Sequence, residues 1–138
     1  MNRRTFQQLA DERILDATVL LEHRRYSAAY YLAGYAVECA LKACIAKQTK
    51  RYDFPPRRSH IEDIYTHDLR RLVKAAGLDK ARIALEAQDI EFSNNWNTVI
   101  LWTEQSRYNT STRDEVRRLL RAVADEDHGV LQWVRRSW

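Results

Sequence analysis

The sequence has little glycine, proline or cysteine, with three, two and two residues respectively among 138. Glycine and proline interrupt helices, so their scarcity favours helix over sheet in a chain with 30 % charged residues. A chain of this length normally folds as one domain, and its core is large enough to need neither disulfides nor bound metal. We therefore expect one all-α domain spanning residues 1–138, without a metal site or a cofactor.

The only two cysteines, Cys39 and Cys44, cannot bridge each other in the helix that the sequence predicts around them. A separation of five residues directs two helical side chains about 140° apart. Two reduced thiols are typical of a cytoplasmic protein. The N-terminal stretch MNRRTFQQLADER also lacks the apolar segment of a signal peptide. We therefore expect a cytoplasmic location.

The chain also lacks an uncharged run long enough to span a membrane. Its least charged stretch, YSAAYYLAGYAVECALKACIAK at 26–47, carries Glu38 and Lys42 in its interior. A charged side chain at the centre of a membrane helix costs about 2.5–3.5 kcal/mol. The stretch is therefore expected to be a buried central helix of a soluble bundle, with no membrane contact.

Helical spacing divides this stretch into lines of different character. One line consists of small residues that let another helix approach closely, namely Ala29, Ala33, Ala36, Ala40 and Ala43. A second line carries all the functional groups, namely Tyr31, Tyr35, Glu38 and Lys42. This polar line is the best candidate for the wall of a binding site, although a structural ion pair of Glu38 with Lys42 is the first interpretation. Glu38 is expected to be half buried and to need a partner such as Arg107.

Capping signals predict the helices around the central one. Thr5-x-x-Gln8 is expected to open a first helix that ends near His23, and Thr112-x-x-Glu115 a long last helix. Asp127 and Gly129 predict a kink or break in that last helix. Thr66 is expected to cap a helix that Gly77 ends.

The remaining segments are less regular. LDKARIALEAQ and NNWNTVILW predict two short helices, at 78–88 and 94–102. Pro55-Pro56 forbids helix locally, and 49–66 is expected to be a long loop. Within and beside it lies the densest group of basic side chains, a candidate contact for phosphate: Lys47, Lys50, Arg51, Arg57, Arg58 and His60.

The order of these pieces is characteristic. A first helix is followed by the run from Ala28 to Ala43, then by HDL at 67–69, and then by Trp102 with Arg107-Tyr108 before a last helix. Over nearly the whole chain this order resembles the HEPN domain family. The resemblance implies an up-and-down bundle of about five helices that forms a homodimer. It also implies a minimal nucleotidyltransferase as a partner, since such domains are often encoded beside one or fused to one, and many act as toxins or defence ribonucleases.

Active HEPN ribonucleases resemble one another in an Arg-x4–6-His motif, commonly with a polar residue after the arginine. Metal-independent RNA cleavage needs a base and an acid for the proton steps, and arginine to stabilise the charge on phosphate. The only match is Arg121 with His128, and Ala122 stands where the polar residue is common. We interpret this pair as a chance match, and catalysis by Arg121 and His128 is the alternative.

Charge and the remaining side chains are compatible with phosphate ligands but do not require them. The net charge is +4, and 18 arginines outnumber five lysines. Arginine presents a planar fork that suits phosphate, and a basic protein attracts RNA or nucleotides, although solvated helix faces explain the same composition. His67 is expected at the first position of a helix, where it either faces a phosphate or supports the cap. Arg107-Tyr108 either clamps a base and a phosphate or anchors the last loop.

Three functions remain open from the sequence. The first is binding of a nucleotide or RNA, or of a minimal nucleotidyltransferase, in a toxin–antitoxin or defence module. The second is a metal-independent ribonuclease, and the third is a structural adaptor without a ligand. In a homodimer, Trp133 and Trp138 are the expected contacts, because tryptophan is enriched at interfaces.

Overall fold

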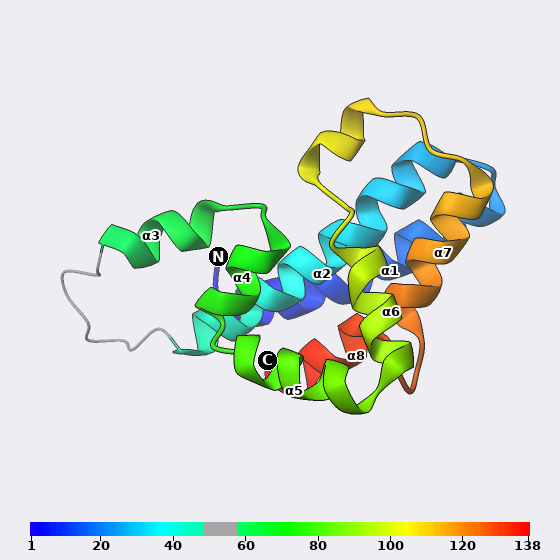
Figure 1. Cartoon of the computed structure of the whole chain (residues 1–138). Coiled ribbons are helices and arrows are strands. Elements are labelled where there is room, and N and C mark those ends of the chain that lie inside the picture. The colour runs from blue at the N-terminus through cyan, green and yellow to red at the C-terminus, as the bar shows by residue number, and fades with distance from the viewer. Residues whose placement is uncertain (49–57) are drawn as a thin grey trace.

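The computed structural model describes the backbone of residues 1–48 and 58–138, and the side chains of 1–48 and 62–138. These residues form helices and no strand (Figure 1). The elements are α1 (Arg3–Glu22), α2 (Tyr26–Gln48), α3 (Arg58–Tyr65), α4 (Leu69–Ala75), α5 (Asp79–Gln88), α6 (Ile90–Val99), the 3-10 helix η1 (Glu104–Tyr108), α7 (Arg113–Ala124) and α8 (Val130–Arg135). The all-α prediction is confirmed, although the described part of the chain contains eight α-helices instead of the expected number of about five.

The centre of the bundle is α2, as its apolar circumference predicts. It contacts α1, α4, α7, α8 and η1 (Figure 1). The five alanines at 29, 33, 36, 40 and 43 are fully buried. Because a methyl side chain projects little from the helix, neighbouring backbones can approach α2 closely. Cys39 and Cys44 are both buried and unbridged.

No helix in the described ranges is long and apolar enough to cross a membrane. For α2, the longest of them, the charges of Glu38 and Lys42 interrupt the apolar surface. The two charges pair with each other, and Glu38 also contacts His67 from outside α2, as described below.

The N-cap residues of α1 and α4 differ from those that the sequence predicts. Asn2 caps α1, and its Oδ1 atom accepts a hydrogen bond from the Thr5 N–H at 3.0 Å. Asp68 caps α4 and accepts from the backbone of Arg70 at 2.9 Å. The predictions for Thr5 and Thr66 are therefore wrong, because in each case a second capping side chain nearby takes the position. Thr112 does cap α7, accepting from the Glu115 N–H at 3.2 Å.

The predicted break in the last helix is confirmed between α7 and α8. The Asp125 carboxylate accepts hydrogen bonds from the N–H groups of Asp127 and His128, at 2.9 and 2.8 Å. This turn replaces the helical hydrogen bonds, so the chain changes direction before Gly129. Gly77, with a φ of 71°, follows Ala76, the C-cap residue of α4, as predicted for a helix stop.

The segment 49–66 is not a continuous loop, because 58–65 form α3. This helix projects from the side of the bundle (Figure 1). Of the predicted basic group, Lys47 lies in α2 and donates to the Ser137 carbonyl at 3.3 Å. Lys50, Arg51 and Arg57, and the side chains of Arg58 and His60, lie outside the described part of the structure.

The tryptophans near the C-terminus have different environments. The Trp133 ring packs inside the bundle at 5.2 Å from the Phe92 ring and 6.4 Å from the Trp96 ring. It is only 9 % exposed, so most of its surface is already used inside the bundle and little is left for a dimer contact. Trp138 stays partly exposed under the guanidinium of Arg135, with 5.6 Å between the Arg135 Cζ and the ring centroid.

Candidate functional site

The polar line of α2 forms one face, as its spacing predicts. The rings of Tyr31 and Tyr35 are stacked with their centroids 5.9 Å apart. One turn further on, the Lys42 ammonium lies 2.9 Å from Oε1 of Glu38. Burial, helped by the neighbouring Cys39 and Glu38, raises the pKa of Tyr35 to about 12. The phenol therefore stays neutral at physiological pH and can only exchange hydrogen bonds.

Glu38 is the buried centre of a charged cluster. The residue is 1 % exposed, and its Oε1 atom lies 2.8 Å from Nδ1 of His67 as well as close to Lys42. The other ring nitrogen of His67 lies 3.2 Å from Oε2 of Glu104. A doubly protonated ring can donate to both carboxylates, whereas a neutral ring can donate to only one. His67 thus joins α2 to η1.

The partner predicted for Glu38 is therefore wrong. Lys42 and His67 take the place that was expected for Arg107. Within the described residues, the second oxygen of Glu38, Oε2, is buried without a hydrogen-bond donor. Nothing in the local sequence identifies His67 as the partner, because Glu38 lies in α2 and His67 lies in the segment between α3 and α4, so the two meet only through the fold.

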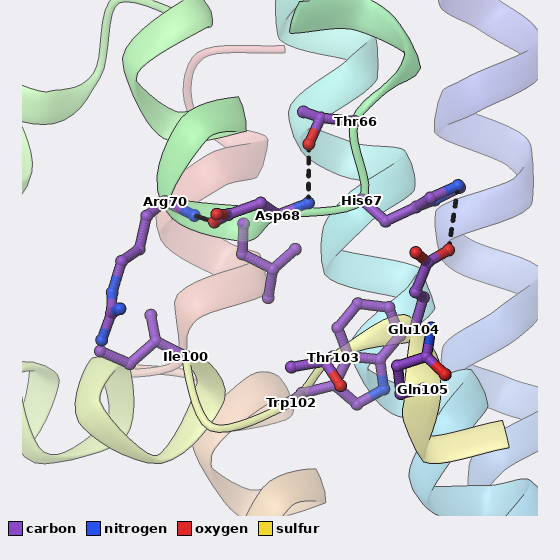
Figure 2. A pocket seen from close by; sticks show the side chains of 10 residues that line it. Thr66, His67, Asp68, Arg70, Ile100, Trp102, Thr103, Glu104 and Gln105 are labelled. Atoms are coloured by element: carbon purple, nitrogen blue, oxygen red, sulfur yellow. Dashed lines mark hydrogen bonds and ion pairs between the residues drawn. The ribbon is translucent and has the colours of Figure 1, made fainter. Parts of the chain in front are cut away.

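His67 does not occupy the first position of a helix. The cap residue of α4 is Asp68, so His67 precedes the helix, and its ring turns towards Glu104 (Figure 2). The Asp68 carboxylate accepts from the N–H groups of Arg70 and Arg71. Because a carboxylate already fills the start of α4, this helix end offers no place for a phosphate.

A pocket of about 360 Å³ opens between the start of α4 and the segment that joins α6 to η1 (Figure 2). Its lining combines polar and apolar side chains: Thr66, His67, Asp68, Leu69, Arg70, Ile100, Trp102, Thr103, Glu104 and Gln105. Arg70 stands on the opposite side of the pocket from His67 and Glu104 (Figure 2). Its guanidinium has no ion pair or hydrogen bond among the described side chains. Arg70 and Ile100 also line a neighbouring pocket of about 310 Å³.

Trp102 forms part of the pocket wall and fixes it to α2. Its Nε1–H donates to the Tyr31 carbonyl at 3.2 Å, and its ring stacks on that of Tyr31 with 6.0 Å between centroids. The indole lies directly over Gly34. The structural roles of Glu104 and Gly34 were not identified from the sequence. The one available signal in the sequence was a single glycine inside a long predicted helix, which allows another side chain to approach the helix backbone closely.

Arg107 and Tyr108 lie in η1 but do not line the pocket. The Arg107 guanidinium sits over the Tyr108 ring, 4.8 Å from its centroid. Tyr108 is 73 % exposed, so the pair projects outward. The structure does not bring these two residues together with Glu38 and Lys42.

The Arg121 and His128 side chains are not joined by a hydrogen bond. His128 faces the start of α6, with Nδ1 2.7 Å from Oδ2 of Asp89 and Nε2 3.1 Å from Oε2 of Glu91. The hydrogen bond to Asp89 raises the pKa of His128 above its ordinary range. The Phe92 N–H and His128 hold the pKa of Asp89 below its ordinary range. Arg121 is exposed on α7.

In the described part of the chain, no three histidine, cysteine, aspartate or glutamate side chains are grouped to hold a metal ion. The cluster of Glu38, His67 and Glu104 is extended, with the imidazole between the two carboxylates. Its ring nitrogens are occupied by hydrogen bonds or ion pairs to oxygen, so the cluster connects elements instead of leaving open ligand positions.

Comparison with known proteins leads to one family. No curated protein and no solved structure matched the chain. A sequence model of the HEPN domain matches residues 5–136, which is almost the full length. The match agrees with the all-helical architecture and with the order of motifs along the chain. The chain therefore belongs to the HEPN domain family.

Proposed function

We propose that this chain binds a nucleotide in the pocket between α4 and η1, and that it acts with a minimal nucleotidyltransferase as one half of a toxin–antitoxin or defence module. Membership of the HEPN family supports a function related to nucleotides or RNA in general. The observation that carries the binding proposal is the unpaired Arg70 guanidinium in that pocket, across from the Glu104 carboxylate.

The volume and lining of the pocket suit a mononucleotide. Ligand pockets usually enclose about 300–1,000 Å³ and combine an apolar wall with a few polar groups. Leu69, Ile100 and Trp102 supply the apolar wall here. The hydroxyl groups of Thr66 and Thr103 can both donate and accept hydrogen bonds, as the edge of a base requires.

The distribution of charged side chains in the pocket determines the orientation in which a nucleotide would bind. Arg70 can donate two parallel hydrogen bonds to a phosphate, and no protein carboxylate competes for its guanidinium among the described residues. The carboxylates of Asp68 and Glu104 would repel a phosphate and accept instead from hydroxyl or amino groups. A nucleotide would therefore place its phosphate at Arg70 and its ribose or base towards Glu104.

The binding proposal is tested by titrating the protein with AMP, ATP, GMP and GTP in a calorimeter. We expect at least one to bind, and Arg70→Ala to weaken that binding at least about tenfold, since a hydrogen bond to a charged group contributes about 1.5–3 kcal/mol. Arg71→Ala is the matched control. It removes the same charge from the same helix, but Arg71 pairs with Asp63 at 3.2 Å and does not line the pocket.

Two results would contradict nucleotide binding here. One is the absence of binding by all four nucleotides, and the other is an equal loss in the two variants. The partner proposal is tested separately, by co-expressing this chain with the product of the neighbouring reading frame and purifying through a tag on one of them. A nucleotidyltransferase that co-purifies in fixed proportion supports it, and an unrelated neighbour that does not co-purify contradicts it.

A further inference from the structure

We propose a second binding site, for closely spaced phosphates, at the end of the molecule where the α1–α2 turn meets the start of α7 (Figure 1). Two hollows of about 410 and 650 Å³ lie there and share Arg24 and Tyr26. The first hollow also contains Arg25, and the second contains Arg113 and Arg117. This site shares no residue with the pocket at Arg70, and the proposal stands whether or not that pocket binds a nucleotide.

The four arginines come from separate segments and converge without partners. Arg24 and Arg25 belong to the turn before α2, while Arg113 and Arg117 lie one helical turn apart at the start of α7. None of these four guanidinium groups has an ion pair or hydrogen bond within the described residues. Some other arginines in the described structure are paired with carboxylates, as Arg135 is with Asp11 at 2.5 Å, and some, such as Arg70, are not. A group of like charges without counterions repels itself and attracts an anion.

The other groups at this end favour an anion as well. Glu22 is the only carboxylate among the residues that line the two hollows. The 23-residue helix α2 begins here with no acidic residue in its first turn, so its partial positive charge is not neutralised locally. Ser27 and Ser111 also line the first hollow, joined by a hydrogen bond of 3.0 Å from the Ser111 N–H to the Ser27 hydroxyl.

The backbone at Arg24 gives an independent indication. Its φ is 60°, in the left-handed region. The Arg24 N–H donates to the Leu21 carbonyl at 3.1 Å and the Arg25 N–H to the Leu20 carbonyl at 2.8 Å. This pattern ends a helix with a residue that is usually glycine, because a side chain costs about 1–2 kcal/mol in that conformation. An arginine held at such a cost marks a position where its side chain has a use.

The chemistry of the ligand follows from the residues. Arginine forks bind phosphate oxygens in pairs, and two adjoining hollows with a common arginine fit two or more linked phosphates. Such a series of phosphates occurs in a phosphodiester chain or in a phosphoanhydride chain. We use a fluorescein-labelled oligouridylate of about 12 nucleotides as the probe for the first and inorganic tripolyphosphate for the second.

Fluorescence anisotropy of the labelled oligouridylate measures binding to wild type and three variants. Arg24→Gly and Arg117→Ala should each weaken binding about tenfold and make it less sensitive to salt, since each removes a phosphate contact. Arg4→Ala, which removes an exposed charge at the far end of α1, should change it less than about twofold. Arg24→Gly relieves the backbone, so it should unfold at the same temperature as wild type or higher, and any lost binding is not lost folding.

Competition identifies the source of the phosphates. If tripolyphosphate displaces the oligouridylate, the site takes a compact phosphoanhydride, and if it does not, the site follows a phosphodiester backbone. Both results support the proposal. It is overturned if Arg24→Gly and Arg117→Ala bind like Arg4→Ala, or if polyglutamate of equal charge competes as well as either phosphate ligand. The Arg70→Ala variant should keep this binding, which separates the two sites.

Discussion

The indole of Trp102 occupies the space that a side chain at Gly34 would need. A methyl group on Gly34 would overlap the ring carbon atoms of Trp102. The same indole donates its N–H to the Tyr31 carbonyl, one turn earlier in α2. This contact holds the chain between α6 and η1 on the central helix. The wall of the candidate pocket therefore depends on the absence of one Cβ atom.

Gly34→Ala should destabilise the protein by about 2 kcal/mol, although alanine is favoured over glycine by about 1 kcal/mol inside a helix. The overlap with Trp102 outweighs the gain in helix propensity, so the net change in unfolding free energy is a loss. Urea unfolding followed by circular dichroism measures the change. In the background of Trp102→Ala, where the indole is absent, the same substitution should be neutral or stabilising. A stabilised Gly34→Ala protein with Trp102 present would contradict the close contact.

Lys42→Met should cost about 3 kcal/mol of unfolding free energy, because it leaves the buried Glu38 carboxylate with one cation fewer. The double variant Glu38→Gln with Lys42→Met should recover much of this loss, since the uncompensated charge is then gone. Chemical denaturation of the two single variants and the double variant gives the coupling energy. Additive losses would show that Glu38 and Lys42 do not interact.

The link between His128 and Asp89 should stabilise the fold most strongly in mildly acidic solution. The pKa of His128 is raised, so its contribution is complete below the ordinary value of 6.5 and is lost as pH rises through the raised pKa. The pKa of Asp89 is lowered, so its contribution is complete above the ordinary value of 3.8 and is lost as pH falls through the lowered pKa.

The melting temperatures of wild type and His128→Gln measure this effect between pH 3 and pH 9. The difference should be largest at about pH 5 and should shrink towards both extremes. Asp89→Asn keeps a side chain that can cap α6, but it removes the charge. In that background, the substitution at His128 should show no such maximum. A difference that is constant with pH would contradict the proposed ion pair.

Asp68→Ala should cost about 1 kcal/mol, because its carboxylate caps the N–H groups of Arg70 and Arg71 at the start of α4. Thr66→Ala should cost clearly less, since its hydroxyl accepts only from the Asp68 N–H, outside the helix. Thermal unfolding of the two variants distinguishes the two assignments. A larger loss of stability in Thr66→Ala than in Asp68→Ala would show that Thr66, and not Asp68, caps α4.

The fold could be predicted from the sequence where the information is local. The spacing of alanines in α2, the capping box at Thr112 and the break near Gly129 each depend on residues within a few positions of one another. The choice between neighbouring caps could not be predicted as well. Asn2 and Thr5, or Thr66 and Asp68, are all residue types that cap helices, and the structure uses the asparagine and the aspartate, which are slightly preferred over threonine.

The candidate site was predicted only in part. Tyr31, Tyr35, Glu38 and Lys42 share a face of one helix, and helical geometry alone places them together. His67 reaches Glu38 from outside α2, and Glu104 in turn contacts His67, so both contacts depend on how the helices pack. Arg24 was visible only as one of many arginines. Its left-handed backbone conformation, which distinguishes it from the other arginines, can be identified only from the three-dimensional structure.

The tight turn between α1 and α2 also has a kinetic consequence. These two helices share the most extensive contact of any pair in the described structure, and only three residues separate them. Helical hairpins with such local contacts form on the microsecond timescale, before contacts between distant segments. We expect the α1–α2 hairpin to be structured in the folding transition state, and the contacts between α2 and α8, which join residues about 90 positions apart, to form after it.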